Sequence, residues 1–148
     1  MNEKGEKKTP QVAVSRRALG GDAPIVISEV SDRCLYTGFF GTLDSSRMKK
    51  VTDTIMDVVN RNDNDLMIVD LSNIDVIDST IANHLKKLNK LLQFVGMEVI
   101  FCGIKPVVAQ SMISAGVELE NITIEKNLKR ALRLLYKKQG LKLVKIDS

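Results

Sequence analysis

The sequence predicts an α/β protein with one domain: a mostly parallel sheet of about five strands with four helices, in the order β-β-α-β-α-β-α-β-α. Near-continuous apolar runs, such as 65–71, alternate with segments whose apolar residues recur every three or four positions. Strands that alternate with helices imply right-handed crossovers and helices packed against a largely parallel sheet. The length of 148 residues suits one domain with a substantial core.

The first half of the chain predicts a hairpin, a helix and a central strand. Two strand-like runs, 25–30 and 33–40, are joined by the short polar pair "SD", which indicates a hairpin. The stretch 43–63 then changes to helical spacing, and one face of it carries Met48, Val51, Ile55, Val58 and Val59. The run "DLMIVDL" (65–71) is typical of a central strand that is covered on both faces.

Two helices and a strand follow. The first helix begins at about Ser79 and stops at Gly96, and its apolar stripe consists of Ile81, Leu85, Leu88 and Leu92. The run 97–103 ("MEVIFCG") predicts another central strand. Pro106 suits the first turn of the next helix, which ends at Gly116.

The last elements are a short edge strand at 120–124 and a helix at 127–138. The apolar residues at helical spacing in that helix are Leu128, Ala131, Leu132 and Leu135. We therefore expect a flexible N-terminal arm over 1–22, the folded domain over 23–137, and a basic C-terminal tail over 138–148.

Charge is distributed unevenly along the chain. The net charge of +4 is the sum of +2 in residues 1–22, −5 in residues 23–125 and +7 in residues 126–148. A basic tail suits nucleic acid or anionic lipid, but no aromatic residues are interleaved with these bases, so we expect neither partner. The apolar runs are too short for a membrane span, and "MNEKGEKKTP" lacks the apolar centre of a signal peptide. A cytoplasmic location is the default expectation.

Catalytic and nucleotide-binding motifs are missing from the sequence. It contains no Gly-x-x-x-x-Gly-Lys, no Gly-x-Gly-x-x-Gly and no Gly-x-Ser-x-Gly. His84, the single histidine, is five positions after Ser79 on the same predicted helix, so the two side chains point to different faces. A Ser–His–Asp hydrolase is therefore disfavoured. We expect no enzyme and no cofactor.

Metal binding has little support either. Cys34 and Cys102 occur singly in apolar runs, without a Cys-x-x-Cys pattern, and are interpreted as buried inert thiols. Asp70, Asp75 and Asp78 offer carboxylates of the kind that hold Mg²⁺, but Asp70 lies within a strand and is better explained by capping or pairing. We expect no metal site.

Functional sites in parallel sheets gather in the turns that follow the carboxyl ends of the strands. Here those turns are 41–45, 72–80 and 103–106, which the predicted topology brings to one edge. The middle turn ends in "VIDST" (76–80), where a helix begins.

Two interpretations of this turn stay open. Asp78 and Ser79 are both favoured helix N-caps, which is a purely structural role. Alternatively, the exposed hydroxyl accepts a phosphoryl group, which adds a charge of about −1.5 to −2 and three acceptor oxygens. The helix dipole tolerates that charge, whereas Asp75 and Asp78 repel it and make the surface strongly negative. Phosphorylation would then displace a docked partner without unfolding the domain.

At this point the sequence resembles a known family. "LMIVDLSNIDVIDSTIANHL" (66–85) is similar to the signature of STAS domains, the sulfate-transporter and anti-sigma-factor-antagonist domains, and the likeness covers about residues 24–136. The stretch "GMEVIFCGIKPVVAQSMISAGVEL" more narrowly resembles scaffold and sensor subunits of the bacterial stressosome. The residues that match their Gly-Ile-x-Pro turn are Gly103, Ile104, Pro106, Ala109 and Gln110. "DSTIANHL" lacks the glycine that plain anti-sigma-factor antagonists place soon after their phosphoserine.

The resemblance implies site residues. In this family the hydroxyl residue directly after the strand-end aspartate is the phosphoacceptor, here Ser79, with Asp75, Asp78 and Thr80 as the supporting turn. "GTLDSSRM" resembles a segment where sensor subunits carry a second phosphoacceptor, which points to Ser45. The implied partner-binding residues are Asp44, Gly103, Ile104, Lys105 and Pro106.

The resemblance also implies a mechanism without catalysis. A serine/threonine switch kinase docks, phosphorylates the domain and is released to act on a downstream phosphatase that controls a general stress or sigma-factor output. A second phosphatase resets the serine, and STAS subunits stack into large homo- or hetero-oligomers. Serine at position 79 favours a scaffold subunit, whereas the match at Ser45 favours a sensor.

Three alternatives stay open. The chain is a plain anti-sigma-factor antagonist, an accessory STAS subunit of another system such as lipid transport, or a binder of nucleic acid or membranes through its basic tail.

Overall fold

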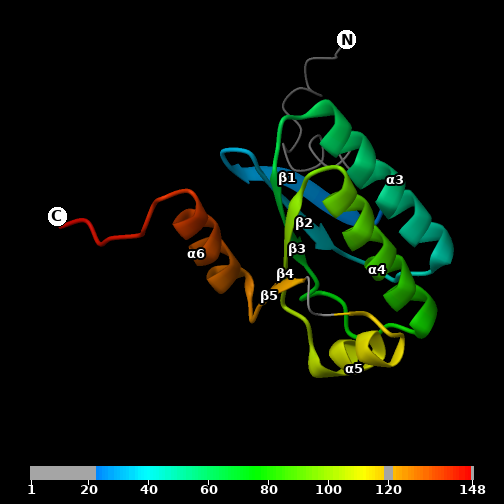
Figure 1. Ribbon diagram of the computed structural model, residues 1–148. Helices are drawn as coiled ribbons and strands as arrows, with labels where there is room; N and C mark the ends of the chain where they lie inside the picture. The colour runs from blue at the N-terminus through cyan, green and yellow to red at the C-terminus, as the bar shows by residue number, and fades with distance from the viewer. Residues whose placement is uncertain (1–22, 119–121, 148) are drawn as a thin grey trace, which may run out of the picture.

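The computed structural model describes residues 23–118 and 122–147, which form one five-stranded sheet flanked by helices (Figure 1). The elements are β1 Ile25–Ser31, β2 Cys34–Phe39, α3 Ser45–Arg61, β3 Leu66–Asp70, α4 Ser79–Phe94, β4 Glu98–Cys102, α5 Pro106–Ser114, β5 Thr123–Glu125 and α6 Leu128–Lys138. The predicted α/β class and order of elements are confirmed. The predicted arm, residues 1–22, lies outside the described residues.

The five strands lie side by side in their chain order. β1 pairs antiparallel with β2, and the pairs β2–β3, β3–β4 and β4–β5 are parallel. The parallel strands are added in one direction, so right-handed crossovers bring α3, α4 and α5 to the same face of the sheet. α6, which follows the last strand, packs on the opposite face (Figure 1). The carboxyl ends of β2, β3 and β4 therefore meet at one edge.

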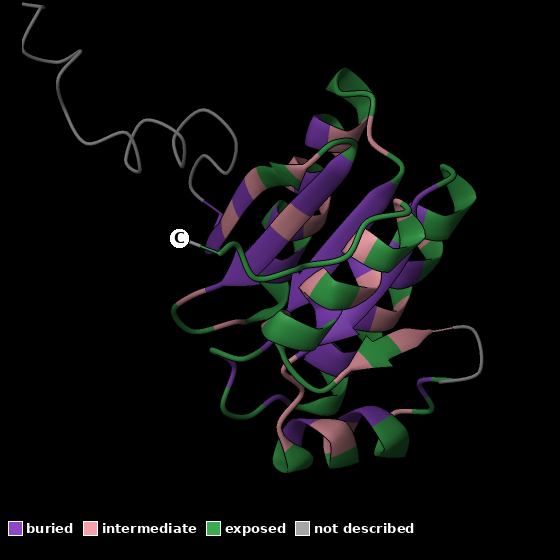
Figure 2. Cartoon of the chain, turned by 90° about the vertical axis from the view of Figure 1, so that its left-hand side faces the viewer, coloured by how far each residue is buried: buried purple, intermediate pink, exposed green. Residues whose placement is uncertain are grey.

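Apolar side chains form a core on each face of the sheet. The larger core, under α3, α4 and α5, contains the predicted helical stripes Met48, Val51, Ile55, Val58, Ile81, Leu85, Leu88 and Leu92. The smaller core, under α6, consists of Cys34, Leu66, Ile68, Ile100, Cys102, Ala131 and Leu135. All five residues of β3 are buried, as predicted for a strand covered on both faces. Figure 2 shows the strands mostly buried and the helices exposed on their outer sides.

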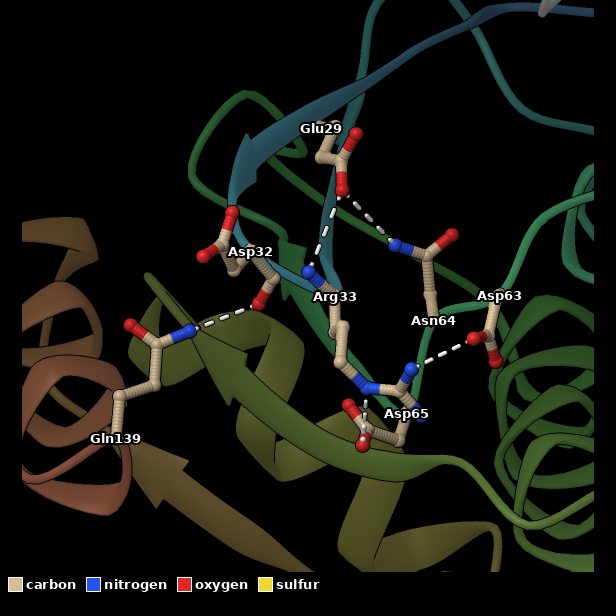
Figure 3. A network of polar contacts seen from close by, with 7 residues as sticks. All are labelled: Glu29, Asp32, Arg33, Asp63, Asn64, Asp65 and Gln139. Carbon is tan, nitrogen blue, oxygen red and sulfur yellow. Dashed lines mark hydrogen bonds and ion pairs between the residues drawn. The ribbon is translucent and has the colours of Figure 1, made fainter.

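The hairpin turn lies one residue later than predicted, and it consists of Asp32 and Arg33. Arg33 has φ +60°, which is uncommon for a residue other than glycine. Its backbone N–H donates to Glu29 Oε2 (3.3 Å), and its guanidinium donates to Asp65 Oδ2 (3.0 Å) and Asp63 Oδ2 (2.6 Å), as Figure 3 shows. Contacts with the α3–β3 loop hold this turn, and a local sequence pattern does not reveal them.

The last strand is also shifted from its predicted place. The prediction was 120–124, whereas β5 runs from Thr123 to Glu125, and residues 119–121 are not described. Thr123 pairs with Ile100 of β4, and the ladder is only three residues long. So short a strand has too little alternation for the sequence to fix its register.

Candidate functional site

Three loops meet at the carboxyl ends of the parallel strands, and we call this surface the C-terminal edge: residues 40–44 after β2, 71–78 after β3 and 103–105 after β4. Residues 41–43 and 73–78, together with Ile81, line a surface depression of about 420 Å³. The first two loops are therefore neighbours, as the topology predicted.

Ser79 is the first residue of α4 and is exposed to solvent. The N-cap is Asp78, whose Oδ1 accepts a hydrogen bond from the backbone N–H of Ile81 at 2.9 Å. The Ser79 hydroxyl has no hydrogen-bond partner among the described residues. Of the two capping candidates in the sequence, the aspartate takes the structural role, so the serine hydroxyl is left available to solvent.

Ser45 has the same local arrangement at the start of α3. Asp44 is the N-cap, and its Oδ1 accepts a hydrogen bond from the backbone N–H of Arg47 at 2.8 Å. Arg47 Nη1 also donates to the carbonyl oxygen of Thr42 at 3.2 Å, which fastens the loop to the first helical turn. Ser45 is exposed. Two exposed serines, each directly after a capping aspartate, therefore begin α3 and α4 at the C-terminal edge.

Lys105 joins the third loop to the second. Its Nζ donates a hydrogen bond to Asp75 Oδ1 and forms an ion pair with it. The hydrogen bond and the positive charge of Lys105 hold the pKa of the Asp75 carboxyl below its usual value. The expectation that Asp75 adds an uncompensated negative charge beside Ser79 is corrected, because a lysine 30 residues away neutralises it.

Beneath the edge, Asp70 at the end of β3 is buried and anchors two elements. Its Oδ2 accepts a hydrogen bond from the Tyr36 hydroxyl (2.7 Å), and its Oδ1 accepts from the backbone N–H of Ser72 (3.0 Å). The capping or pairing role predicted for Asp70 is therefore confirmed. Burial, and then the hydrogen bond to Asp70, raise the pKa of Tyr36. The sequence did not reveal Tyr36 as the partner, although a lone aspartate in an apolar strand signals that one is needed.

Gly103 has a structural role that only glycine fills. Its φ of +71° is in the left-handed region, and a Cβ there would lie 2.8 Å from Ser72 Cβ and 2.9 Å from Asp70 Oδ1. The β4–α5 loop thus approaches the backbone of the β3–α4 loop closely. Gly103 is half-buried and packs the two loops against each other; its part in partner binding stays a prediction.

The other predicted partner-binding residues divide between surface and core. Pro106 is exposed at the first position of α5, whereas Ile104 packs against the larger core. Two exposed valines that the sequence reasoning missed, Val76 and Val107, lie in or next to the loops at this edge. Val76 alone of the apolar residues in "IDVI" is exposed, because its neighbours Ile74 and Ile77 enter the core.

The described residues hold no group of three or more His, Cys, Asp or Glu side chains that suits a metal ion. Over ranges 23–118 and 122–147, none of the helices has the length and apolar character that crossing a bilayer requires. Cys34 and Cys102 are free and buried, and burial raises the pKa of each thiol to about 12. Thiols with so high a pKa are poor nucleophiles at neutral pH.

Comparisons with known proteins agree with this architecture. Residues 26–131 match the family described as "STAS domain". The "RsbT co-antagonist protein RsbRA" of Bacillus subtilis (strain 168) is 22% identical over 108 residues, which cover 73% of this chain and 39% of that protein.

Two solved structures have the same fold. An RsbS variant of Moorella thermoacetica superposes with a TM-score of 0.70 at 22% identity and covers 80% of this chain and all of its own. A chain from the structure titled "Molecular architecture of the stressosome, a signal integration and transduction hub" superposes with a TM-score of 0.68 at 23% identity, covering 77% of this chain and 97% of its own. At these identities the likeness shows the fold alone.

The chain spans between 33% and 39% of the length of the first three curated relatives that it matches. The family match, in contrast, takes in all five strands except the first residue of β1, together with α3, α4 and α5. This match, the five-stranded sheet and the loops at its C-terminal edge lead to one conclusion: the chain belongs to the STAS domain family.

Proposed function

We propose that this chain is a non-enzymatic signalling module of a stressosome-type partner-switching pathway, and that a serine/threonine switch kinase phosphorylates it on Ser79. The observation that carries the proposal is the exposed Ser79 hydroxyl at the start of α4, beside an aspartate that already caps the helix. The similarity to a co-antagonist protein supports this pathway over other uses of the fold.

The kinase docks across the C-terminal edge. Exposed Val76 and Val107 supply apolar contact area, and the ion pair between Lys105 and Asp75 joins the two loops beside them. Of the predicted partner-binding residues, Asp44, Lys105 and Pro106 contribute directly, while Gly103 and Ile104 act by shaping the loop.

Phosphorylation changes the charge of this surface without unfolding the domain. A phosphoryl group on Ser79 adds a charge of about −1.5 to −2 beside the carboxylate of Asp78. The first turn of α4 tolerates the added charge, because unpaired backbone N–H groups and the helix dipole favour anions there. The kinase then loses its fit and is released, and a cognate phosphatase restores the unmodified serine. We assign the whole cycle to the cytoplasm.

Ser45 is the second acceptor in this proposal, because it repeats the arrangement of Ser79 after the capping residue Asp44. Other STAS subunits complete a large homo- or hetero-oligomer. Neither nucleic acid nor membrane has a part in the proposed cycle.

The test is phosphorylation by the cognate kinase with ATP, followed by intact-mass measurement and peptide mapping. The wild-type chain should gain one phosphate on the peptide that contains Ser79 and a second on the peptide that contains Ser45. Ser79→Ala should lose the first label, and Ser45→Ala should keep it. Ser46→Ala, an exposed serine next in sequence, is the matched control. If Ser79→Ala is labelled as fully as the wild type after the same reaction time, the assignment is overturned.

A plain anti-sigma-factor antagonist remains the rival function, and particle size separates the two. Light scattering of the chain mixed with candidate STAS subunits should show very large particles for the stressosome proposal. A complex containing only the chain and its kinase would favour the plain antagonist, and a partner from a lipid-transport system would favour an accessory subunit.

A further inference from the structure

The outer side of α6 carries a stripe of positive charge, which we call the basic face. Ala131 and Leu135 pack against the sheet, so the opposite side of the helix is exposed to solvent. Four exposed cations lie there at helical spacing: Lys129, Arg130, Arg133 and Lys137. None of the four has an ion-pair partner among the described residues, and residues 126–146 contain no Asp or Glu. The charge of the basic face is therefore uncompensated.

The segment after α6, residues 141–147, is the second observation, and we call it the exposed tail. It carries no regular secondary structure. Its aliphatic side chains are exposed, with fractions of 57% for Leu141, 71% for Leu143, 69% for Val144 and 89% for Ile146. Lysines are interleaved with them at positions 142 and 145. Four such side chains leave an apolar surface in water, which transfer to an apolar environment would stabilise.

The end of α6 joins the basic face to the exposed tail. Gly140 has φ +79°, and its backbone N–H donates to the Lys137 carbonyl oxygen at 3.0 Å. The Leu141 N–H donates to the Tyr136 carbonyl oxygen at 2.7 Å. This pair of hydrogen bonds around a left-handed glycine is the Schellman arrangement of helix ends. Figure 1 shows α6 and the tail together on the side of the sheet away from α3 and α4, so the two features are adjacent.

Charge indicates an anionic partner for this surface. Residues 126–148 have a net charge of +7, whereas residues 23–125 have −5, so an anionic surface attracts the α6 side of the molecule and repels the rest. The aliphatic side chains select among anionic partners. A nucleic acid offers phosphates to the cations but little apolar contact to the tail. An anionic bilayer offers both, with headgroups for the cations and hydrocarbon beneath them.

The tail also suits a bilayer better than a protein groove. Leu143 and Val144 are consecutive, and successive side chains of an extended chain point to opposite sides. The tail is drawn out in Figure 1. A groove on a protein covers one side of such a segment, whereas the interfacial region of a bilayer surrounds a segment that lies in it.

We propose that the basic face and the exposed tail bind peripherally to an anionic phospholipid bilayer. The cations contact the lipid phosphates, and the aliphatic side chains of the tail enter the boundary between headgroups and acyl chains. This proposal takes up the membrane alternative that the sequence left open, with exposed aliphatic residues in place of the missing aromatic ones. It is separate from the proposed phosphorylation cycle, because the surface shares no residue with the loops that lead into Ser45 and Ser79.

Sedimentation with lipid vesicles tests the binding. The chain should sediment with vesicles made of equal amounts of phosphatidylcholine and phosphatidylglycerol, and it should stay in the supernatant with vesicles of phosphatidylcholine alone. Raising the salt concentration should weaken the binding, because salt screens the cations of the basic face. Absence of binding to the mixed vesicles, or equal binding to both kinds of vesicle, would overturn the proposal.

Charge-reversal variants assign the binding to the basic face. Arg130→Glu/Arg133→Glu should weaken binding to the mixed vesicles at least about tenfold. Lys49→Glu/Lys50→Glu makes an equal change of charge at exposed positions of α3 and should weaken it far less. An equal loss in the two variants would show that net charge alone is responsible, and it would refute the basic face as the binding surface.

Two measurements test the insertion of the tail. Leu143→Ser/Ile146→Ser changes no charge and should also weaken binding at least about tenfold, whereas an unchanged affinity would refute insertion. Both native cysteines are buried, so Val144→Cys provides the reactive thiol of the folded chain. A polarity-sensitive fluorophore on it should shift its emission to the blue on the mixed vesicles. The same fluorophore on Val107→Cys, exposed near the start of α5, should not shift, and equal behaviour at the two positions would contradict the proposal.

Duplex DNA of random sequence is the competing ligand. If it binds the wild type and Leu143→Ser/Ile146→Ser equally well while the mixed vesicles bind neither, the surface recognises nucleic acid and the proposal is overturned. Kinase labelling of Ser79 in the serine variant should equal that of the wild type. Failure of bilayer binding and failure of the phosphorylation proposal are therefore separate results.

Discussion

Gly103→Ala is the sharpest perturbation of the C-terminal edge. The residue has φ +71°, and a Cβ there would approach Ser72 Cβ to 2.8 Å, Asp70 Oδ1 to 2.9 Å and the Ser72 backbone nitrogen to 3.0 Å. Two of these neighbours are a backbone atom and a side chain held by hydrogen bonds, so neither moves freely. The alanine therefore displaces the β3–α4 loop or the β4–α5 loop.

The expected cost has two parts. A left-handed conformation costs a residue with a Cβ about 1–2 kcal/mol. Overpacking a well-filled site adds about 1–3 kcal/mol. The substitution should thus lower the free energy of unfolding by about 2–5 kcal/mol, a large share of the roughly 5–15 kcal/mol that stabilises a domain. Gly96→Ala is the matched control, because its φ of +90° carries the first cost while no atom lies within 4 Å to cause the second.

Urea denaturation followed by far-ultraviolet circular dichroism measures both variants, and linear extrapolation gives their free energies of unfolding. Gly103→Ala should be less stable than Gly96→Ala by about 1–3 kcal/mol, the packing cost alone. It should also be phosphorylated on Ser79 more slowly, since the loop before α4 has moved. Equal stabilities for the two variants would refute the claim that close approach, rather than backbone conformation, requires glycine here.

Two further predictions concern the cap of α4 and the buried thiols. Asp78→Ala should cost about 1 kcal/mol because the Ile81 N–H loses its acceptor. Asp78→Ser keeps a capping oxygen and should recover most of the loss in the same urea assay; an Asp78→Ala chain as stable as the wild type would contradict the cap. Burial raises the pKa of Cys34 and Cys102 from 9.0 to about 12, so the folded chain keeps protons that the unfolded chain releases. Their contribution to stability is complete below pH 9 and is lost as the pH rises towards 12. Cys102→Val should reduce this slope, measured as urea midpoints across the window, and an unchanged slope would argue against burial as its cause.

Local patterns in the sequence predicted much of the fold. The stripe from Ile81 to Leu92 predicted α4 because its 3.6-residue period leaves one apolar face, and the run 65–71 predicted a strand buried on both sides. The meeting of the loops that lead into Ser45 and Ser79 also followed from the order of elements, since parallel strands end at a common edge. Ser79 as the acceptor remains a prediction.

Local sequence patterns could not predict which distant residues pair. Asp75 and Lys105 are 30 residues apart, and Tyr36 and Asp70 are 34 apart. Each pair depends on the path of two loops or on the register of two strands, and sequence periodicity specifies neither. The charge beside Ser79 was overestimated for this reason.

Within ranges 23–118 and 122–147, α6 is the one helix on the second face of the sheet, and this has one more consequence. Cys34 and Cys102 lie in the small core that α6 covers with Ala131 and Leu135. Detachment of α6 alone, with the other helices still in place, would bare both sulfur atoms to a reagent in solution. The rate of thiol labelling under native conditions therefore reports how often this helix lifts from the sheet, and the molecule contains its own probe of that motion.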